Sequence, residues 1–315
     1  MKKIVISGAT SYIALAIIRE MALRDIDVVA IIRPKSTRRK YVEQISPLYV
    51  GAKLTICENE LGELMDANIL KECVGADTFI HVGWSSDFEN PRFNLNGQMK
   101  NVEFMVNAIE LARKVGCERF LGLGSQAECG IQSNSITVFT QNNPITAYGR
   151  AKCEAYNYGK QLCERYGMIF LWVRILSVYG PWERQNTLIM STIRSALMKK
   201  EVGFTRAEQI WDYLYVDDAA RGIIAVVEKG THGVKYPLGY GCGRVLKEYI
   251  EIIAKTIGNP SIVQGIGKIP YVESQPMYLV ADISKLTADT DWKPKIDFEE
   301  GIFKTISWVI NENER

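Results

Sequence analysis

The chain has 315 residues, and its 38 Lys and Arg residues nearly balance its 36 Asp and Glu residues, which leaves a net charge of +2. This length can bury a sizeable core, in one large domain or in a domain with a smaller lobe. The balanced charge gives no general attraction to nucleic acid or to an anionic membrane, and no run of about 18 apolar residues predicts a membrane span. We therefore expect neither of those partners.

The seven cysteines are scattered without a Cys-x-x-Cys pair, and their odd number argues against a complete disulfide framework. This pattern favours a reducing, cytoplasmic location. The His, Cys and carboxylate residues show no spacing that is typical of a metal site, so we predict none.

The first part of the chain alternates between strand and helix patterns. Residues 4–7 form a short β-branched run, an apolar helical pattern follows, and residues 27–33 are apolar enough for a strand buried on both faces. Repeated units of this kind, with right-handed crossovers, predict an α/β fold with a Rossmann-type doubly wound parallel sheet. Further strands are expected near 53–57, 78–82, 119–123 and 169–175, and helices near 67–73, 97–115 and 147–166.

Beyond Gly180 and Pro181 the alternation becomes less regular. We expect a first domain over residues 1–180 and a smaller lobe over residues 181–315, of which residues 210–240 partly return to the first sheet. Helices are predicted at 188–199, 218–228 and 247–257, and a strand at 213–216.

The turn from Gly8 to Ala14 joins the first strand to the first helix, where the pyrophosphate of a dinucleotide would meet the free N–H groups of a helix N-terminus. The glycine pattern is incomplete, because Ser11 stands where a second glycine would let the backbone approach phosphate. The turn alone therefore leaves two interpretations open, a dinucleotide site and an ordinary turn.

Arg33 ends the second predicted strand, where an acidic residue would bind the ribose hydroxyls of NAD. An arginine there suits a 2′-phosphate instead, and Ser36, Arg38 and Arg39 lie nearby in the sequence. The pattern favours NADP over NAD, with a solvated basic loop as the alternative interpretation.

Tyr148 and Lys152 fall one turn apart on a helix that Thr146 can cap, so a cation would favour the ionised form of a phenol. Ser125 follows a predicted strand, at the edge of the sheet where ligands bind, and its hydroxyl can donate a hydrogen bond to a substrate carbonyl. Tyr-x-x-x-Lys occurs at two other places in the chain, and only the strand-end serine and the helix cap select this one.

Several motifs run in one order over nearly the whole chain. They are Gly8–Ile13, Glu63–Asp66, Ile80–Val82, Ser125 with Gly130, Tyr148–Lys152, Arg174 with Val178–Pro181, and Tyr215–Asp218. Together they resemble the extended short-chain dehydrogenase/reductase family of nucleotide-sugar epimerases, dehydratases and reductases.

The resemblance implies that Tyr148 is the acid or base, that Lys152 activates it and binds the nicotinamide ribose, and that Ser125 donates to the carbonyl. It also implies that the first domain binds NAD(P), that the later lobe binds substrate, and that the helices at 97–115 and 147–166 form a homodimer. The residues expected at the cofactor are Gly8, Thr10, Ser11, Tyr12, Ile13, Arg33, Ser36, Glu63, Leu64, Val82, Gly83, Tyr148, Lys152, Leu176, Ser177 and Val178.

The chain also departs from the family pattern. Gln126, Ala127, Glu128 and Cys129 follow Ser125, so the Asp-Glu pair with which a 4,6-dehydratase of this family eliminates water is missing, and dehydration is not expected. Trp211 replaces an arginine that grips the diphosphate of a nucleotide sugar in many relatives. The candidate substrate contacts are Trp84, Gln126, Arg184 and Trp211.

We therefore expect an enzyme that uses NADP to reduce a keto group on a sugar, with a 4-keto-6-deoxy nucleotide sugar as the leading candidate, and with NAD as the alternative cofactor. A second hypothesis is an NAD-dependent nucleotide-sugar 4-epimerase. A third, from another class, is a protein that senses dinucleotides without catalysis.

Overall fold

A computed structural model describes residues 1–272 and 275–313. Its centre is a seven-stranded sheet in the order β10-β6-β5-β4-β1-β2-β3, in which every neighbouring pair is parallel. The predicted doubly wound α/β fold is thereby confirmed. The strands are β1 (Lys3–Ser7), β2 (Asp27–Ile32), β3 (Leu54–Glu58), β4 (Thr78–His81), β5 (Arg119–Ser125), β6 (Ile169–Ile175) and β10 (Lys235–Leu238).

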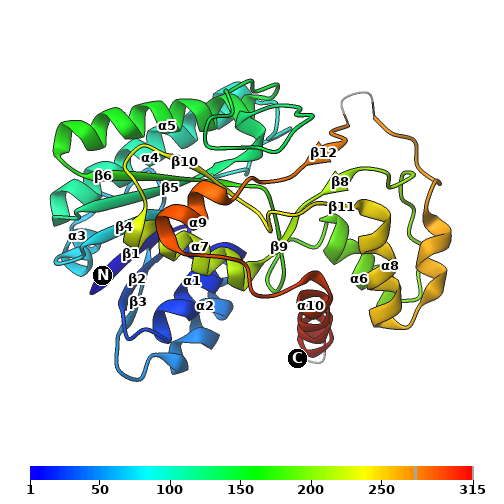
Figure 1. Ribbon diagram of the computed structural model, residues 1–315. Helices are drawn as coiled ribbons and strands as arrows, with labels where there is room; N and C mark the ends of the chain where they lie inside the picture. The colour runs from blue at the N-terminus through cyan, green and yellow to red at the C-terminus, as the bar shows by residue number, and fades with distance from the viewer. Residues whose placement is uncertain (273–274, 314–315) are drawn as a thin grey trace.

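Helices cover both faces of this sheet (Figure 1). Successive side chains of a strand point to opposite faces, so Ile4 and Ile6 pack with α1 while Val5 packs with α4 and α5. The strands therefore need apolar residues on both sides, which explains their continuous hydrophobic runs. One face carries α1 (Tyr12–Ala22), α2 (Arg39–Ile45) and α7 (Val216–Lys229), and the other carries α3 (Ala67–Cys73), α4 (Leu95–Val115) and α5 (Ala147–Tyr166).

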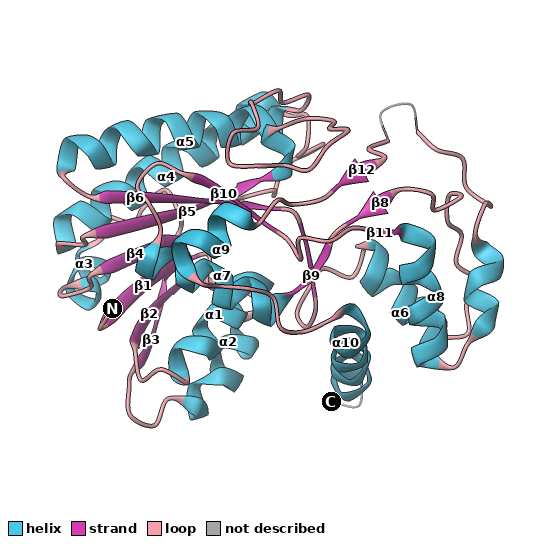
Figure 2. Cartoon of the chain, in the orientation of Figure 1, coloured by secondary structure: helices cyan, strands magenta, loops and turns pink. Residues whose placement is uncertain are grey.

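The remaining elements lie mostly beyond the carboxyl ends of the large sheet, on the right in Figure 2. They form two small sheets and a group of helices, and β10 returns from this region to pair with β6. Among the described residues no helix is long and apolar enough to cross a membrane. The strands of the two small sheets are β7 (Ser177–Tyr179) with β9 (Tyr213–Tyr215), and β8 (Ile210–Trp211) with β11 (Arg244–Val245) and β12 (Tyr278–Leu279). The remaining helices are α6 (Leu188–Leu197), α8 (Leu246–Ile257), α9 (Ser284–Thr290) and α10 (Phe298–Asn313).

Several expected boundaries differ from the structure by one or two residues. The strand expected to run to 216 ends at Tyr215, and α7 starts at Val216 rather than at Asp218. The reason is that Asp217 and Asp218 lie within the first helical turn, where carboxylates interact favourably with the helix dipole. The helix expected to run to 199 ends at Leu197.

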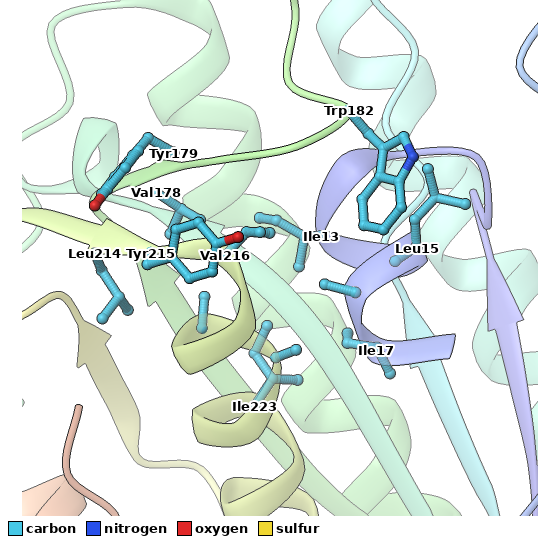
Figure 3. Packing of buried hydrophobic residues seen from close by; sticks show 14 of the residues in the cluster. Ile13, Leu15, Ile17, Val178, Tyr179, Trp182, Leu214, Tyr215, Val216 and Ile223 are labelled. Atoms are coloured by element: carbon cyan, nitrogen blue, oxygen red, sulfur yellow. The ribbon is translucent and has the colours of Figure 1, made fainter. Parts of the chain in front are cut away.

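The first helix is held between the sheet and the chain that follows β6. Figure 3 shows Ile13, Leu15 and Ile17 of α1 next to Val178 and Trp182, which follow β6, and to Ile223 of α7, all within one buried cluster. This packing fixes the N-terminus of α1 at the carboxyl edge of the sheet, where open α/β sheets bind ligands.

Gly8 makes the turn from β1 to α1 through a close approach of two backbones. It has a φ of +70°, and a Cβ at this position would lie 2.4 Å from the Cα of Gly83. A side chain is therefore excluded both by the left-handed conformation and by the chain that leaves β4.

We expect Gly8→Ala to lower the free energy of unfolding by at least about 3 kcal/mol, because the backbone at Gly83 must move. Gly75 is a matched control, since its φ is +79° but a Cβ would meet nothing within 4 Å. Gly75→Ala should cost only about 1 kcal/mol. Denaturant unfolding of both variants checks this difference, and equal losses would contradict the importance of the Gly83 contact.

Candidate functional site

Ser125 is the last residue of β5 and caps the short 3-10 helix formed by Gln126–Glu128. Its Oγ accepts from the backbone N–H of Ala127 at 3.2 Å, while its own N–H donates to Oε1 of Glu128 at 2.8 Å. This reciprocal pair is a capping box. It leaves the hydroxyl proton of Ser125 free to donate to another group.

The Glu128 carboxylate is fully buried and receives three kinds of donor. Besides the N–H of Ser125, it accepts from Nε1 of Trp172 at 3.1 Å and from Nε of Arg174 at 2.9 Å. Arg174 is also fully buried, so this is an ion pair without solvent. Its other nitrogens donate to the carbonyl of Thr140 at 3.1 Å and to Oδ1 of Asn142 at 2.6 Å.

This ion pair is not apparent from the sequence. Two signals were present: an arginine inside the apolar strand 169–175, and a glutamate three residues after a capping serine. Neither indicates that the two side chains meet, because β5 and β6 are adjacent only in the folded sheet.

The helix α5 begins as expected, with the Thr146 hydroxyl accepting from the N–H of Gly149 at 3.0 Å. Position 149 requires a glycine, because a Cβ there would lie 2.2 Å from the carbonyl oxygen of Ala127. The start of α5 thus touches the backbone of the turn that follows Ser125, which brings the neighbouring Tyr148 close to Ser125.

Tyr148 is half-buried and hydrogen-bonded to the Ser125 side chain. Burial raises the pKa of the phenol, and the hydrogen bond with Ser125 opposes that rise. The positive charges of Arg92 and Arg184 also oppose it, more weakly. Tyr148 is consequently protonated at neutral pH in this structure.

The position of Lys152 differs from the expectation that it makes Tyr148 more acidic. Its Nζ donates to the carbonyl oxygen of Leu123 at 2.7 Å and lies 3.4 Å from the centre of the Trp84 ring, but 5.8 Å from the centre of the Tyr148 ring. Burial lowers the pKa of Lys152 to about 7, and the Glu128 carboxylate opposes this change. The pKa of Tyr148 is raised rather than lowered, because its own burial outweighs the nearby charges.

The turn between β1 and α1 fits a dinucleotide phosphate. Ser11 takes the expected second glycine position but caps α1, its Oγ accepting from the N–H of Ala14 at 3.2 Å. The first turn of α1 carries no acidic residue, and Arg38 donates to the carbonyl of Thr10 at 2.8 Å. A helix N-terminus next to a guanidinium favours an anion.

Arg33 follows β2 and is exposed, where it forms an ion pair with Asp87. Ser36 accepts from the N–H of Arg38 at 3.4 Å, and Arg39 pairs with Glu43 and Glu58. Arg33 and Arg39 are thus both engaged by exposed ion pairs, which solvent screens strongly, one at Arg33 and two at Arg39.

The structure places the other expected cofactor residues along the same edge of the sheet. Tyr12 donates to the carbonyl of Val178 at 3.3 Å, and Gly83 is approached by Gly8. Glu63 is exposed, whereas Leu64 is fully buried. Ile13 and Leu176 are buried, and Thr10, Val82 and Ser177 are half-buried.

His81 ends β4 and is 3% exposed, with its Nδ1 2.7 Å from Oγ of Ser7. Burial lowers its pKa to about 3, and the charge of Lys152 adds to this effect. The imidazole is therefore neutral and acts as a packed strand residue.

A pocket of about 430 Å³ lies beyond the sheet, between α6 and the small three-stranded sheet. Trp211 lines this pocket and donates from Nε1 to Oγ of Ser177 at 2.7 Å. Trp211, an expected substrate contact, is thus hydrogen-bonded to Ser177, an expected cofactor contact. The described lining residues are all uncharged: Asn186, Leu188, Ser191, Thr192, Val202, Gly203, Phe204, Thr205, Gln209, Trp211, Tyr213, Leu246, Ile269 and Gln275.

Two other expected substrate contacts have different surroundings. Gln126 is a half-buried residue of the turn after Ser125. Arg184 is exposed and donates from Nη2 to Oγ of Ser86 at 3.2 Å, which connects the loop after β7 to the loop after β4. Among residues 1–272 and 275–313, no group of three His, Cys, Asp or Glu side chains could hold a metal ion.

Glu183 is a further carboxyl group near the site that the sequence did not indicate. Burial raises its pKa to about 8, against weaker hydrogen bonds from Thr187 and from the backbone of Gly180. Its Oε2 is buried without a hydrogen-bond partner among the described residues. The charge on Glu183 raises the pKa values of Tyr12 and Tyr213, although burial is the larger cause for both.

Comparison with known proteins extends these observations. The model of the NAD dependent epimerase/dehydratase family matches residues 4–239. A dTDP-glucose 4,6-dehydratase of Escherichia coli is 31% identical over 57% of this chain, and the match spans only 52% of that protein. A putative UDP-glucose 4-epimerase of Methanocaldococcus jannaschii is 25% identical over 98% of this chain and 99% of that protein.

Among solved structures, a dTDP-glucose 4,6-dehydratase of Bacillus anthracis in complex with NAD has a TM-score of 0.85. The superposition covers 100% of this chain and 98% of the other, at 20% identity. At that identity the likeness shows the shared fold.

The raised pKa of Glu183 predicts a pH-dependent stability. Between about pH 4.5 and pH 8 the folded protein keeps a proton that the unfolded chain releases, so the free energy of unfolding falls as the pH rises through this window. We expect Glu183→Gln to raise the free energy of unfolding by about 1–2 kcal/mol near pH 8.5 and to change it little near pH 4.5.

Thermal or denaturant unfolding at both pH values measures this effect. Glu89→Gln, at an exposed position of the loop after β4, serves as the control and should change little at either pH. A gain from Glu183→Gln that is equal at the two pH values would show that titration of this carboxyl is not its cause.

Proposed function

Because the chain belongs to the NAD-dependent epimerase/dehydratase family, we propose that it transfers a hydride at a sugar carbon, in the form of NADP-dependent reduction of a 4-keto-6-deoxy nucleotide sugar. The observation that supports this most is the convergence of Ser125, Tyr148 and Lys152 at the carboxyl edge of the sheet. No acidic side chain stands in the two positions after Ser125.

Each of the three residues has a role that its surroundings support. Tyr148 is protonated and donates its proton to the carbonyl oxygen of the substrate. The Ser125 hydroxyl donates to Tyr148 in this structure, and towards the substrate oxygen the same proton stabilises the charge that develops there. Lys152 would hold the ribose next to the nicotinamide of a bound cofactor, and that cofactor would supply the hydride.

Dehydration needs an acid and a base beside the sugar, and this chain offers an amide at Gln126 and a methyl group at Ala127. Glu128 does not replace them, because its carboxylate is fully buried against Arg174 and Trp172. For this reason we do not extend to this chain the activity that the names of the dehydratase relatives state.

The uncharged pocket supports a nucleotide-linked substrate whose nucleoside lies in the pocket and whose diphosphate lies outside it. Its polar and aromatic lining suits a nucleoside rather than a phosphate, since a buried phosphate needs charged or multiple hydrogen-bond partners. We assign the diphosphate to the exposed Arg184, whose charge lowers the pKa of Tyr148. Arg184 would thus take the place of the diphosphate-binding arginine that is a tryptophan in this chain, Trp211.

We expect Tyr148→Phe to lower kcat for NADPH-dependent reduction of a 4-keto-6-deoxy nucleotide sugar by roughly 10²–10⁴-fold, because the proton donor is lost. Tyr158→Phe is the matched control, since Tyr158 lies on the same helix but is 51% exposed. Oxidation of NADPH, followed by absorbance, measures both variants. Unchanged turnover in Tyr148→Phe would rule out the assigned role.

The preference for NADP rests on Arg33. Arg33→Ala should raise the KM for NADPH about tenfold and leave the KM for NADH unchanged, because one charge-assisted contact with the 2′-phosphate is lost. Stability should hardly change, as only the exposed ion pair with Asp87 is removed. Arg113→Ala, which removes an exposed arginine of α4, is the control. Equal effects on the two cofactors would argue against a 2′-phosphate site.

Epimerisation at carbon 4 is the second candidate, and the match to a putative UDP-glucose 4-epimerase over nearly the whole chain favours it. The same three residues serve both reactions, with Tyr148 acting first as base and then as acid. Interconversion of two UDP-sugars without net loss of NADPH or NADH would favour it over reduction. A protein that only senses dinucleotides would bind the cofactor and change neither kind of sugar.

The homodimer through α4 and α5 and the cytoplasmic location stay predictions. Size-exclusion chromatography with light scattering tests the first of them. The division into a cofactor-binding part over residues 1–180 and a mostly substrate-binding part over residues 181–315 is likewise proposed, on the positions of the Gly8 turn and of the uncharged pocket.

A further inference from the structure

We propose that Trp84 is a positioning residue for the reaction, which holds the Lys152 ammonium on its face and packs at right angles to the Tyr148 ring. The inference rests on the proposed function, in which both of those residues act. It replaces the expectation that Trp84 contacts the substrate.

The contact with Lys152 is close and shielded. Nζ lies 3.4 Å from the centre of the Trp84 ring, and Lys152 is 5% exposed. A cation over an indole face is attracted most strongly where water is excluded. One N–H of the ammonium is directed to the carbonyl oxygen of Leu123 at 2.7 Å, so the strand end and the indole together define where Nζ lies.

The same indole also contacts Tyr148. The two ring centres are 6.0 Å apart and the ring planes meet at 88°, an edge-to-face arrangement that aromatic pairs prefer. Trp84 therefore touches both members of the Tyr-x-x-x-Lys motif from outside their helix. Rotation of the indole would displace the ammonium and the phenol together.

Two buried polar residues of α4 hold Trp84 in this orientation. Nε1 of Trp84 donates to Oε1 of Gln98 at 2.8 Å, and Nε2 of Gln98 donates to the carbonyl of Pro91 at 2.7 Å. Asn101 fixes the next residue, accepting from the N–H of Ser85 at 2.6 Å and donating to its carbonyl at 3.0 Å. Gln98 is 2% exposed and Asn101 is fully buried, so solvent does not compete for these bonds.

These contacts leave little of the indole for a substrate. One face carries the ammonium, the ring packs at right angles to Tyr148, and the N–H is bonded to Gln98. A side chain engaged in this way acts through its neighbours. Its removal should therefore alter the state of Lys152 more than the affinity for sugar.

The state of Lys152 depends on the groups that face it. Glu128 on the turn after β5 favours the charged ammonium, and His81 on β4 is neutral. The indole face adds a second stabilisation of the charged form. Without it, Lys152 should lose its proton at a lower pH.

The test compares Trp84→Leu, Trp84→Phe and the control Trp308→Leu, which removes another half-buried indole on α10. In Trp84→Leu we expect kcat to fall roughly tenfold, the KM for the sugar to change less than about twofold, and the alkaline loss of activity to begin about one pH unit lower. Trp84→Phe keeps an aromatic face and should recover most of kcat. Trp308→Leu should leave the pH profile unchanged.

A second measurement does not depend on activity. NMR titration of the Lys152 ammonium, assigned with a Lys152→Arg variant, should show a midpoint about one pH unit lower in Trp84→Leu than in Trp308→Leu. An unchanged midpoint would overturn the proposal, even if the sugar substrate is misassigned. A raised KM for the sugar with an unchanged pH profile would show instead that Trp84 contacts the substrate. A shifted midpoint without turnover on any keto sugar would retain the positioning role and reject the proposed reaction.

Discussion

The buried carboxylate of Glu128 is the interaction on which the candidate site depends. It binds the N–H of Ser125 at the end of β5 and the guanidinium of Arg174 on β6, so it joins two adjacent strands where the sheet ends. Arg174 extends this connection to residues 140 and 142 of the loop that leads into α5. A buried ion pair of this kind contributes little net stability, but removal of one partner leaves an uncompensated charge. The main consequence of this pair is that it fixes the ends of β5 and β6 and the loop before α5 relative to one another.

Close approaches between backbones complete that geometry. Gly149 lets the start of α5 touch the turn after Ser125, and Gly8 lets the turn after β1 touch the chain that leaves β4. One contact sets Tyr148 beside Ser125, and the other places the N-terminus of α1 at the same edge of the sheet. Both parts of the site therefore share one rigid support, the carboxyl ends of β1, β4 and β5.

The environment of Lys152 shows how a family motif acquires properties of its own. The helical spacing places Tyr148 and Lys152 on one face of α5, yet the indole of Trp84 occupies the space over the ammonium. Burial brings the pKa of Lys152 to about 7, so small changes in its surroundings change its charge near neutral pH. The hydrogen bonds that Gln98 accepts from Trp84 and Asn101 accepts from Ser85 explain why α4 buries two polar side chains in an otherwise apolar face.

The sequence by itself determined the doubly wound sheet, the turn at Gly8, the helix cap at Thr146 and the presence of Ser125, Tyr148 and Lys152. These features depend on hydrophobic periodicity, turn residues and capping, which act over a few neighbouring positions. Only the tertiary structure decided that Glu128 meets Arg174, that Trp84 covers Lys152 and that Trp211 bonds to Ser177. Each of these pairs joins residues that are far apart in the chain, and their contacts follow from the packing of the folded sheet, which local patterns do not specify.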